Sequence, residues 1–183
     1  MGPEVDRSSI YRIDGEDHLT FVSAAWLEFA QANMVPDLTE QRVLGRVLWD
    51  FISDAETIHL YMMILEAVRA ARRTVTVPFR CDSPDCRRLM ELRLYPVHGG
   101  IEFDARLIRS EPRDEVAFLD PRRPRSLTPQ RTCCWCKRLD VDGEWLEVES
   151  ALQRLRLFEA APLPMLTHVV CSDCRGRVLG SLS

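Results

Sequence analysis

A chain of 183 residues with 46% hydrophobic side chains can bury one mid-sized core and a smaller one beside it. The formal net charge of −4 comes from an acidic beginning, since residues 1–60 carry 11 acidic side chains and 4 arginines, and this balance does not suit a dedicated nucleic-acid-binding domain. No apolar run is long enough to span a membrane and the first residues are acidic rather than signal-like, so we expect a cytoplasmic protein.

Two short β-prone runs come first, over residues 10–13 and 19–22. The residues between them, 14–17 (Asp-Gly-Glu-Asp), are typical of turns, so the two runs are predicted to form a hairpin. Ser23 follows directly and can cap a helix over residues 24–30.

The segment before the longest predicted helix is polar over residues 33–41, which we expect to be a loop, and apolar over 43–52. Ser53 and Glu56 have the spacing of a capping box, which predicts a helix that continues to about residue 72. The apolar positions at helical spacing predict a buried stripe of Ile58, Met62 and Leu65, with Tyr61 and Val68 alongside.

Three segments then alternate between apolar and polar side chains, over residues 74–79, 89–94 and 101–107. His98-Gly99-Gly100 is predicted to form the turn between the last two. This alternation gives each strand one buried face and one solvent-exposed face, which is typical of an antiparallel sheet with helices on one side.

The order of these elements, two strands, then helices, then three strands, resembles that of PAS domains. The residues that carry the resemblance are Phe21–Trp26 after the second strand, residues 43–52, and the three closing strands. The resemblance covers residues 8–113 and implies an α+β fold, with a five-stranded antiparallel sheet and helices on one face, in a sensory or regulatory protein. Ser23 departs from the pattern, because many PAS domains have asparagine there, although a serine can also cap a helix.

The resemblance also suggests a small-molecule site. Several aromatic and methionine side chains are expected to face the sheet and could line a cavity, although core packing explains them equally well: Trp26, Phe29, Met62, Phe79, Met90 and Phe103. His59 lies where haem-binding PAS domains carry their axial histidine, but its place about 100° from the predicted stripe favours a surface position. A light-sensing flavin domain would need a cysteine within residues 43–54, which contain none.

A change in composition divides the chain after residue 113. Residues 120–131 contain three prolines and four arginines, which is typical of a solvated linker, so we predict a sensor domain over 1–113, a linker over 114–131 and a zinc-binding module over 132–183. A phosphate-binding or nucleic-acid-binding arm is the alternative interpretation of the arginines.

Two C-x2-C pairs are the sharpest chemical signal in the sequence. Cys133 and Cys136 form the first pair, Cys171 and Cys174 the second, and 34 residues lie between the pairs. A two-residue spacer lets both thiolates of a pair face one point, and four thiolates complete the tetrahedral shell of Zn²⁺, so we predict a structural zinc site.

Two neighbours are alternatives within this site. Cys134 would form a less usual C-x-C pair with Cys136, and His168 could replace one thiolate, although an outer or surface role suits it better.

The long spacer between the pairs must hold folded structure. Trp145, Val148, Leu152 and Leu155 fall at helical spacing after a turn at Asp142-Gly143, which predicts one amphipathic helix packed over the metal site. Together with Cys134–Arg138 and Thr167–Cys171, this pattern resembles a small bacterial cysteine-rich module found beside sensor domains, and implies a zinc-ribbon or zinc-knuckle fold without an established activity.

Two further cysteines, Cys81 and Cys86, flank a turn between predicted strands. A second metal site would need two more ligands and a redox pair would need the C-x-x-C spacing, so free thiols are expected. Arg80, Arg87 and Arg88 surround the same turn and could bind an anion or a partner carboxylate, although a solvated turn is the simpler interpretation.

We therefore expect a bacterial, cytoplasmic PAS-type regulatory protein that binds a small ligand or a protein partner, forms a homodimer and carries one structural Zn²⁺. The alternative is a zinc-dependent nucleic-acid-binding transcriptional regulator that uses the arginine-rich linker and the zinc module. Motifs of serine hydrolases, P-loop nucleotide-binding proteins, kinases and zinc proteases do not occur, so no enzyme activity is expected. An enzyme built on the cysteine-rich tail would need an open coordination position on its zinc.

Overall fold

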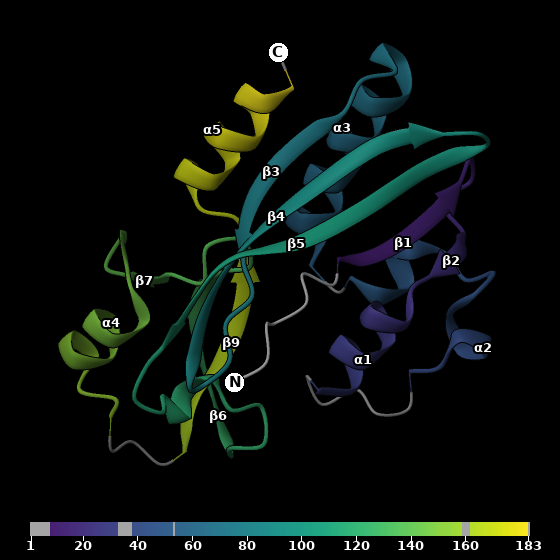
Figure 1. Cartoon of the computed structure of the whole chain (residues 1–183). Helices are drawn as coiled ribbons and strands as arrows, with labels where there is room; N and C mark the ends of the chain where they lie inside the picture. Colours follow the sequence, from purple (N-terminus) through teal and green to yellow (C-terminus); the bar gives the residue numbers. More distant parts are fainter. Residues whose placement is uncertain (1–7, 33–37, 53, 159–161, 183) are drawn as a thin grey trace.

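The computed structural model describes residues 8–32, 38–52, 54–158 and 162–182. Within these residues the chain forms two sheets, with helices beside each (Figure 1). No helix in this part of the chain is both long and apolar enough to cross a membrane.

The first sheet is antiparallel and has five strands, as expected from the sequence, and its strand order is β2-β1-β5-β4-β3. Its strands are β1 (Ser9–Asp14), β2 (Leu19–Val22), β3 (Val75–Arg80), β4 (Cys86–Val97) and β5 (Gly100–Pro112). The turn between β1 and β2 forms because one Asp14 carboxylate oxygen accepts hydrogen bonds from the backbone of Glu16 and His18. Gly100 is required where β5 meets β1, since a Cβ there would lie 1.8 Å from the carbonyl oxygen of Ile13.

The helices between the second and third strands are α1 (Ala24–Ala32), α2 (Glu40–Val43), the 3₁₀ turn η1 (Leu48–Phe51) and α3 (Ala55–Ala71). Ser23 caps α1 as predicted, because its Oγ accepts a hydrogen bond from Trp26 N at 3.2 Å. The predicted loop over residues 33–41 lies partly outside the described residues, and its end forms α2.

The start of α3 differs from the predicted capping box. Asp54 is the N-cap, and its carboxylate accepts hydrogen bonds from the backbone of Glu56 and Thr57, while Ser53 lies outside the described residues.

The predicted buried stripe of α3 was also wrong in part. The helix buries Thr57, Leu60, Ile64, Leu65 and Val68, whereas Met62 is 53% exposed and Ile58 only half-buried. Apolar residues occur on most sides of this helix, so its periodicity could not select the face that packs on the sheet.

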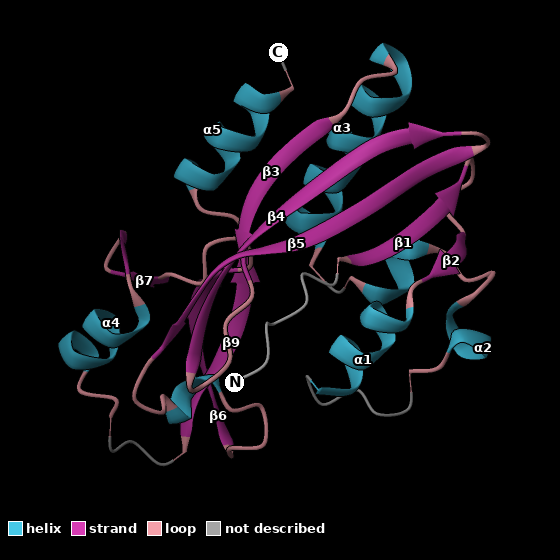
Figure 2. Cartoon of the chain, viewed as in Figure 1, coloured by secondary structure: helices cyan, strands magenta, loops and turns pink. Residues whose placement is uncertain are grey.

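One face of the first sheet carries the core. Ile13, Val77, Leu94, Ile101 and Phe103 are buried there against the helices, and Figure 2 shows α3 behind the strands. The other face is polar. The ion pairs between Arg12 and Glu102 and between Arg106 and Asp104 lie there. This division is the one expected for an antiparallel sheet with helices on one face.

The second sheet has four strands in the order β8-β7-β6-β9, and β6 and β9 are parallel. Its strands are β6 (Arg125–Cys133), β7 (Leu139–Val141), β8 (Glu144–Leu146) and β9 (Leu163–Val169), and its helices are α4 (Val148–Leu155) and α5 (Ser172–Ser181). The C-terminal part therefore has two helices, where the sequence predicted one.

The linker predicted over 114–131 was wrong for much of its length. Residues Ala117–Leu119 form a 3₁₀ turn, η2, in which Phe118 is buried, and β6 begins at Arg125. Pro129 is tolerated because the pairing of β6 with β9 shifts register between Arg125 and Pro129. The arginine-rich composition did not indicate a strand here, because β6 pairs with β9, which lies far along the chain.

Helix α4 does not pack over the cysteines, contrary to the prediction. Its buried residues Val148, Ala151 and Leu152 join a separate apolar cluster with Phe118 and Leu139. Helix α5 is the one beside the cysteines, and it also contacts β3 and α3 (Figure 1).

The first sheet and the cysteine-containing segment share one core. Cys133, Trp135, Cys171, Cys174 and Val178 belong to the same buried cluster as the apolar face of the five-stranded sheet. The metal-binding candidates are therefore packed against the sheet rather than tethered to it.

Candidate metal centre

The first cysteine pair lies on a tight turn between β6 and β7, here called the cysteine turn (residues 133–137). Cys133 ends β6, and its backbone N–H donates to the carbonyl of Arg138 at 2.8 Å while its carbonyl accepts from Lys137 N at 2.9 Å. Lys137 has φ 65°, which lets the chain reverse into β7. This backbone places the side chains of Cys133 and Cys136 on the same side of the turn, as a two-residue spacer predicts.

The second pair lies at the start of α5. Cys171 is the N-cap, and its Sγ accepts a hydrogen bond from Cys174 N at 3.4 Å. Cys174 lies one turn further along, so both sulfurs of this pair lie at the N-terminal end of α5.

The four sulfurs converge on one point. The Sγ atoms of Cys133, Cys136, Cys171 and Cys174 all lie within 4.8 Å of one another, and those of Cys136 and Cys171 are 3.8 Å apart. A tetrahedral zinc with Zn–S bonds of about 2.3 Å requires sulfur–sulfur separations of about 3.8 Å. The donor set and its spacing therefore fit a metal ion that prefers four thiolates.

The pKa values of three of these thiols indicate that a cation is needed for all four to ionise. Hydrogen bonds from Cys136 and Cys174 lower the pKa of Cys133, whereas the same contacts raise the pKa of Cys136 to about 12 and raise that of Cys174 as well. One thiolate thus accepts from its neighbours, and further negative charge would be repelled. A divalent cation supplies the opposite charge that allows all four sulfurs to be thiolates.

The neighbouring candidates are not part of the cluster. The Sγ of Cys134 lies 2.8 Å from the hydroxyl oxygen of Thr57, and burial raises the pKa of this thiol to about 11. His168 is exposed on β9, opposite Thr132 of β6. The geometry therefore gathers the four predicted cysteines and leaves these two side chains outside.

Trp135 fixes the cysteine turn to the first sheet. The indole Nε1 donates to the carbonyl of Pro78 at 2.7 Å, and the Trp135 carbonyl accepts from Arg80 N at 2.8 Å. The Trp135 ring also lies 5.5 Å from the ring of Tyr61 in α3, measured between centroids. The side chain is 5% exposed, so the turn is anchored in the core by its own spacer residue.

The first turn of α3 is connected to both cysteine pairs. The Glu56 carboxylate accepts a hydrogen bond from Val170 N at 3.0 Å, immediately before Cys171, and Thr57 contacts Cys134. These contacts link the first turn of α3 to the two segments that carry the four cysteines. Sequence reasoning placed Glu56 in a capping box and missed this second contact.

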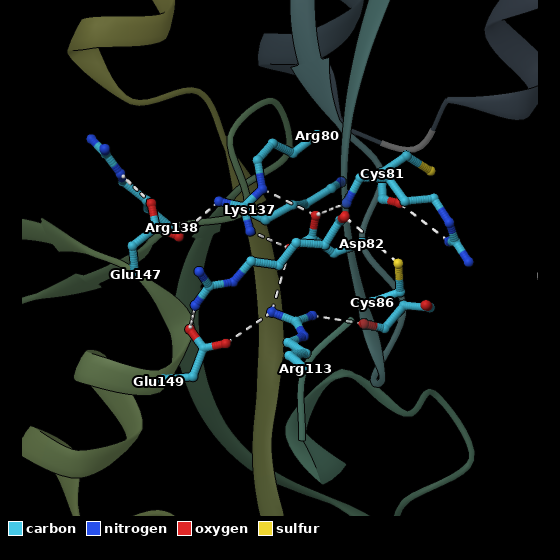
Figure 3. A network of polar contacts seen from close by, with 12 residues as sticks. Arg80, Cys81, Asp82, Cys86, Arg113, Lys137, Arg138, Glu147 and Glu149 are labelled. Atoms are coloured by element: carbon cyan, nitrogen blue, oxygen red, sulfur yellow. Dashed lines mark hydrogen bonds and ion pairs between the residues drawn. The ribbon is translucent and has the colours of Figure 1, made fainter. Parts of the chain in front are cut away.

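A network of arginines and carboxylates joins the β3–β4 turn to the C-terminal part (Figure 3). The side chain of Asp82 is 1% exposed and pairs with Arg80 and, at 3.6 Å, with Arg113. Arg80 also pairs with Glu147 at 2.7 Å, and Arg113 pairs with Glu149 at 3.1 Å. This network was not predicted, because its members come from three segments that are far apart in the chain, around residues 80–82, 113 and 147–149.

The arginine cluster predicted at this turn is engaged internally. Arg80 belongs to the network, Arg87 pairs with Glu149 at 2.6 Å, and Arg88 donates to the carbonyl of Cys81. The three arginines therefore contact groups of the same chain, whereas the sequence suggested a solvated turn or binding of an external anion.

Cys81 and Cys86 are free thiols, as expected. The Sγ of Cys86 lies 3.1 Å from the hydroxyl oxygen of Ser110, and Cys81 is half-buried, which raises the pKa of its thiol.

The six side chains considered as a ligand cavity lie in different surroundings. Phe103 is fully buried and stacks on Tyr11 with ring centroids 4.3 Å apart, and Met90 is also buried. Trp26 and Phe29 are half-buried on α1, Met62 is on the exposed side of α3, and Phe79 lies in a small hollow beside Trp135. His59 is exposed, in agreement with the surface position favoured by the sequence.

Comparison of the chain with models of known protein families and with curated proteins found no match. The features of the chain that bear on its function are the five-stranded sheet and the four-cysteine cluster that could hold a metal.

Proposed function

We propose that the chain is a PAS-type regulatory protein whose four-cysteine cluster binds one structural zinc ion. The observation that carries the proposal is the convergence of Cys133, Cys136, Cys171 and Cys174 within 4.8 Å, packed against α3 and β3. Four protein thiolates fill the tetrahedral shell of zinc and leave no position for an activated water, so the ion stabilises structure and does not catalyse hydrolysis.

The surroundings of the cluster support zinc. Four thiolates around Zn²⁺ carry a net charge of −2, which needs donors nearby. Arg177 donates to the Sγ of Cys174 at 3.2 Å, and the backbone N–H of Cys171 donates to the Sγ of Cys133 at 3.4 Å. These contacts stabilise thiolates and orient them toward the ion.

The regulatory part of the proposal is supported by the five-stranded antiparallel sheet with α1 and α3 on its apolar face, which the PAS resemblance implies. A small ligand or a protein partner that moves α3 would act on the cysteine turn through Glu56, Thr57 and Tyr61. In this proposal the zinc centre keeps the C-terminal part rigid, so that the position of its surface changes when the sheet and helices change. Two copies of the chain form a homodimer.

The contacts of three of the four arginines in residues 120–131 weigh against the alternative of a nucleic-acid-binding regulator. Arg122 pairs with Asp120 at 2.8 Å, Arg131 pairs with Asp140 at 2.6 Å, and Arg125 donates to backbone carbonyls. Side chains held in this way offer little free positive charge to a phosphate backbone.

Native mass spectrometry of the reduced protein, purified without chelators, tests both parts of the proposal. We expect one zinc per chain and a dimer. A Cys136→Ser variant should lose most of its zinc, whereas the matched Cys134→Ser variant should retain it, because Cys134 contacts Thr57 instead of the cluster.

The outcomes separate the two parts. Zinc-free wild-type protein, or equal loss in both serine variants, would contradict the metal site. A bound small molecule, seen as additional mass, or a dimer would support the regulatory assignment. A monomer without a bound small molecule would count against it.

A further inference from the structure

A second candidate site lies in the C-terminal part, away from the cysteines. It is a cavity of about 540 Å³ between η2, the end of α4 and the start of β9, within the size range of small-molecule sites. Its walls are the apolar side chains of Val116, Phe118, Leu152 and Leu163. All four are buried members of the second apolar cluster, so the cavity is backed by a packed core.

Two charged side chains line the same cavity. Arg123 and Glu115 are both exposed, and neither side chain forms a hydrogen bond or an ion pair within the described residues. By contrast, Arg122 and Asp120 next to them neutralise each other at 2.8 Å. Glu115 and Arg123 therefore place one anion and one cation at the cavity, and each also interacts electrostatically with the Asp120–Arg122 pair, Glu115 with Arg122 and Arg123 with Asp120.

The charge behind the wall is positive. The Arg125 guanidinium lies 5.2 Å from the centroid of the Phe118 ring and donates to the carbonyl oxygens of Phe118, Asp120 and Pro164. All of these acceptors are neutral, so its charge is not cancelled by a carboxylate contact. Burial lowers the pKa of Arg125, and the nearby Asp120 carboxylate, which is already paired with Arg122, opposes this shift only in part. Arg123 and Arg125 together outweigh Glu115.

We propose that this cavity binds a small apolar molecule that carries one anionic group, such as a medium-chain carboxylate. Its hydrocarbon part would lie against Phe118 and Leu152, and its anionic group would lie at Arg123. This site is independent of the zinc centre and of the sheet that carries the proposed regulatory function.

The test is calorimetric titration of the metal-loaded 183-residue chain with decanoate, below the concentration at which decanoate forms micelles. Decanol and decyltrimethylammonium provide the same chain with a neutral and a cationic head. We expect decanoate to bind most tightly of the three. Arg123→Gln should weaken decanoate about two- to fivefold and leave decanol unchanged, as for one exposed charge contact.

Removal of the negative charge of Glu115 should change the affinity for decanoate in the opposite direction to removal of the positive charge of Arg123. Glu115→Gln should tighten decanoate binding, because it removes a like charge from the cavity, and Arg175→Gln on α5 should have no effect. Amide chemical shifts of Ala117 and Leu163 should move on titration, which places the ligand in this cavity. Failure of decanoate to bind, tighter binding of the cation, or weakening by both Arg123→Gln and Glu115→Gln would overturn the proposal of an anionic ligand.

Discussion

Replacement of Trp135 by alanine tests whether the metal centre and the five-stranded sheet form one folding unit. Trp135 lies between the two cysteines of the first pair, and its side chain is buried in the core of the sheet. If the cysteine turn were only tethered to the sheet, this substitution would weaken the turn alone. If both share one core, it should destabilise the entire chain.

The expected magnitude follows from the contacts that are lost. Truncation of a buried tryptophan to alanine costs about 3–5 kcal/mol of unfolding free energy. Within that total, the hydrogen bond from Nε1 to the carbonyl of Pro78 contributes about 1 kcal/mol, and the ring contact with Tyr61 about 0.5–1.5 kcal/mol. Since single domains are stable by only about 5–15 kcal/mol, the loss should be easy to measure.

The assay is urea unfolding of the metal-loaded protein, followed in parallel by far-ultraviolet circular dichroism and by a dye that reports released zinc. In the wild-type protein the two signals should change together, as coincident probes do in a two-state transition. In Trp135→Ala both midpoints should move to lower urea by the same amount. Trp135→Phe keeps a ring but removes the donor, so it should cost about 1–3 kcal/mol.

Trp145→Ala provides the matched control, because Trp145 is only half-buried on β8 and should cost clearly less. The reasoning would be refuted if Trp135→Ala released zinc at low urea while the circular dichroism transition stayed in place. A loss below about 1 kcal/mol would refute it as well, since a buried tryptophan cannot be truncated so cheaply in a shared core.

Two further predictions concern the arginine–carboxylate network. Asp82→Asn should cost about 1–3 kcal/mol in urea unfolding, because Arg80 and Arg113 lose their shared carboxylate but keep Glu147 and Glu149 as partners. Asp85→Asn on the exposed side of the same turn should be nearly neutral, and equal effects of the two substitutions would contradict a buried ion pair at Asp82. Burial alone would raise the pKa of Glu147, but hydrogen bonds from Arg80 and Arg138 lower it overall, so its contribution to stability is present above the unfolded-state pKa of about 4.3 and is lost as the pH falls through the lower folded-state value. The melting temperature of Glu147→Gln should therefore fall less steeply than that of the wild type between roughly pH 6 and pH 3, with bound zinc measured in the same samples; parallel curves would show that Glu147 carries no such linkage.

Local patterns were sufficient for much of the first sheet and for the four cysteines that cluster. The hairpin over residues 9–22 and the strands β3 to β5 follow from turn residues and from alternation with a period of two, both of which act between near neighbours. The cysteine pairs were equally accessible, because a two-residue spacer alone determines that two sulfurs can face one point.

Other features depended on segments that meet only in the folded chain. The sequence predicted a linker where β6 pairs with β9, since proline and arginine content describes a segment and not its partner. The face of α3 was ambiguous because apolar residues lie on most of its sides, and only packing against the sheet selected Leu60 and Ile64 over Met62. The position of α4 away from the cysteines was decided in the same way, by the cluster around Phe118.

The sequence by itself therefore determined which four cysteines can form a cluster that could hold a metal, and the tertiary structure decided which parts of the chain this cluster contacts. Trp135 and Glu56 were visible as a spacer residue and a capping residue, but their contacts with Pro78 and Val170 join segments far apart in the chain. Such contacts form because burial of the indole and pairing of buried polar groups favour one compact arrangement. That preference belongs to the whole chain, and no local pattern encodes it.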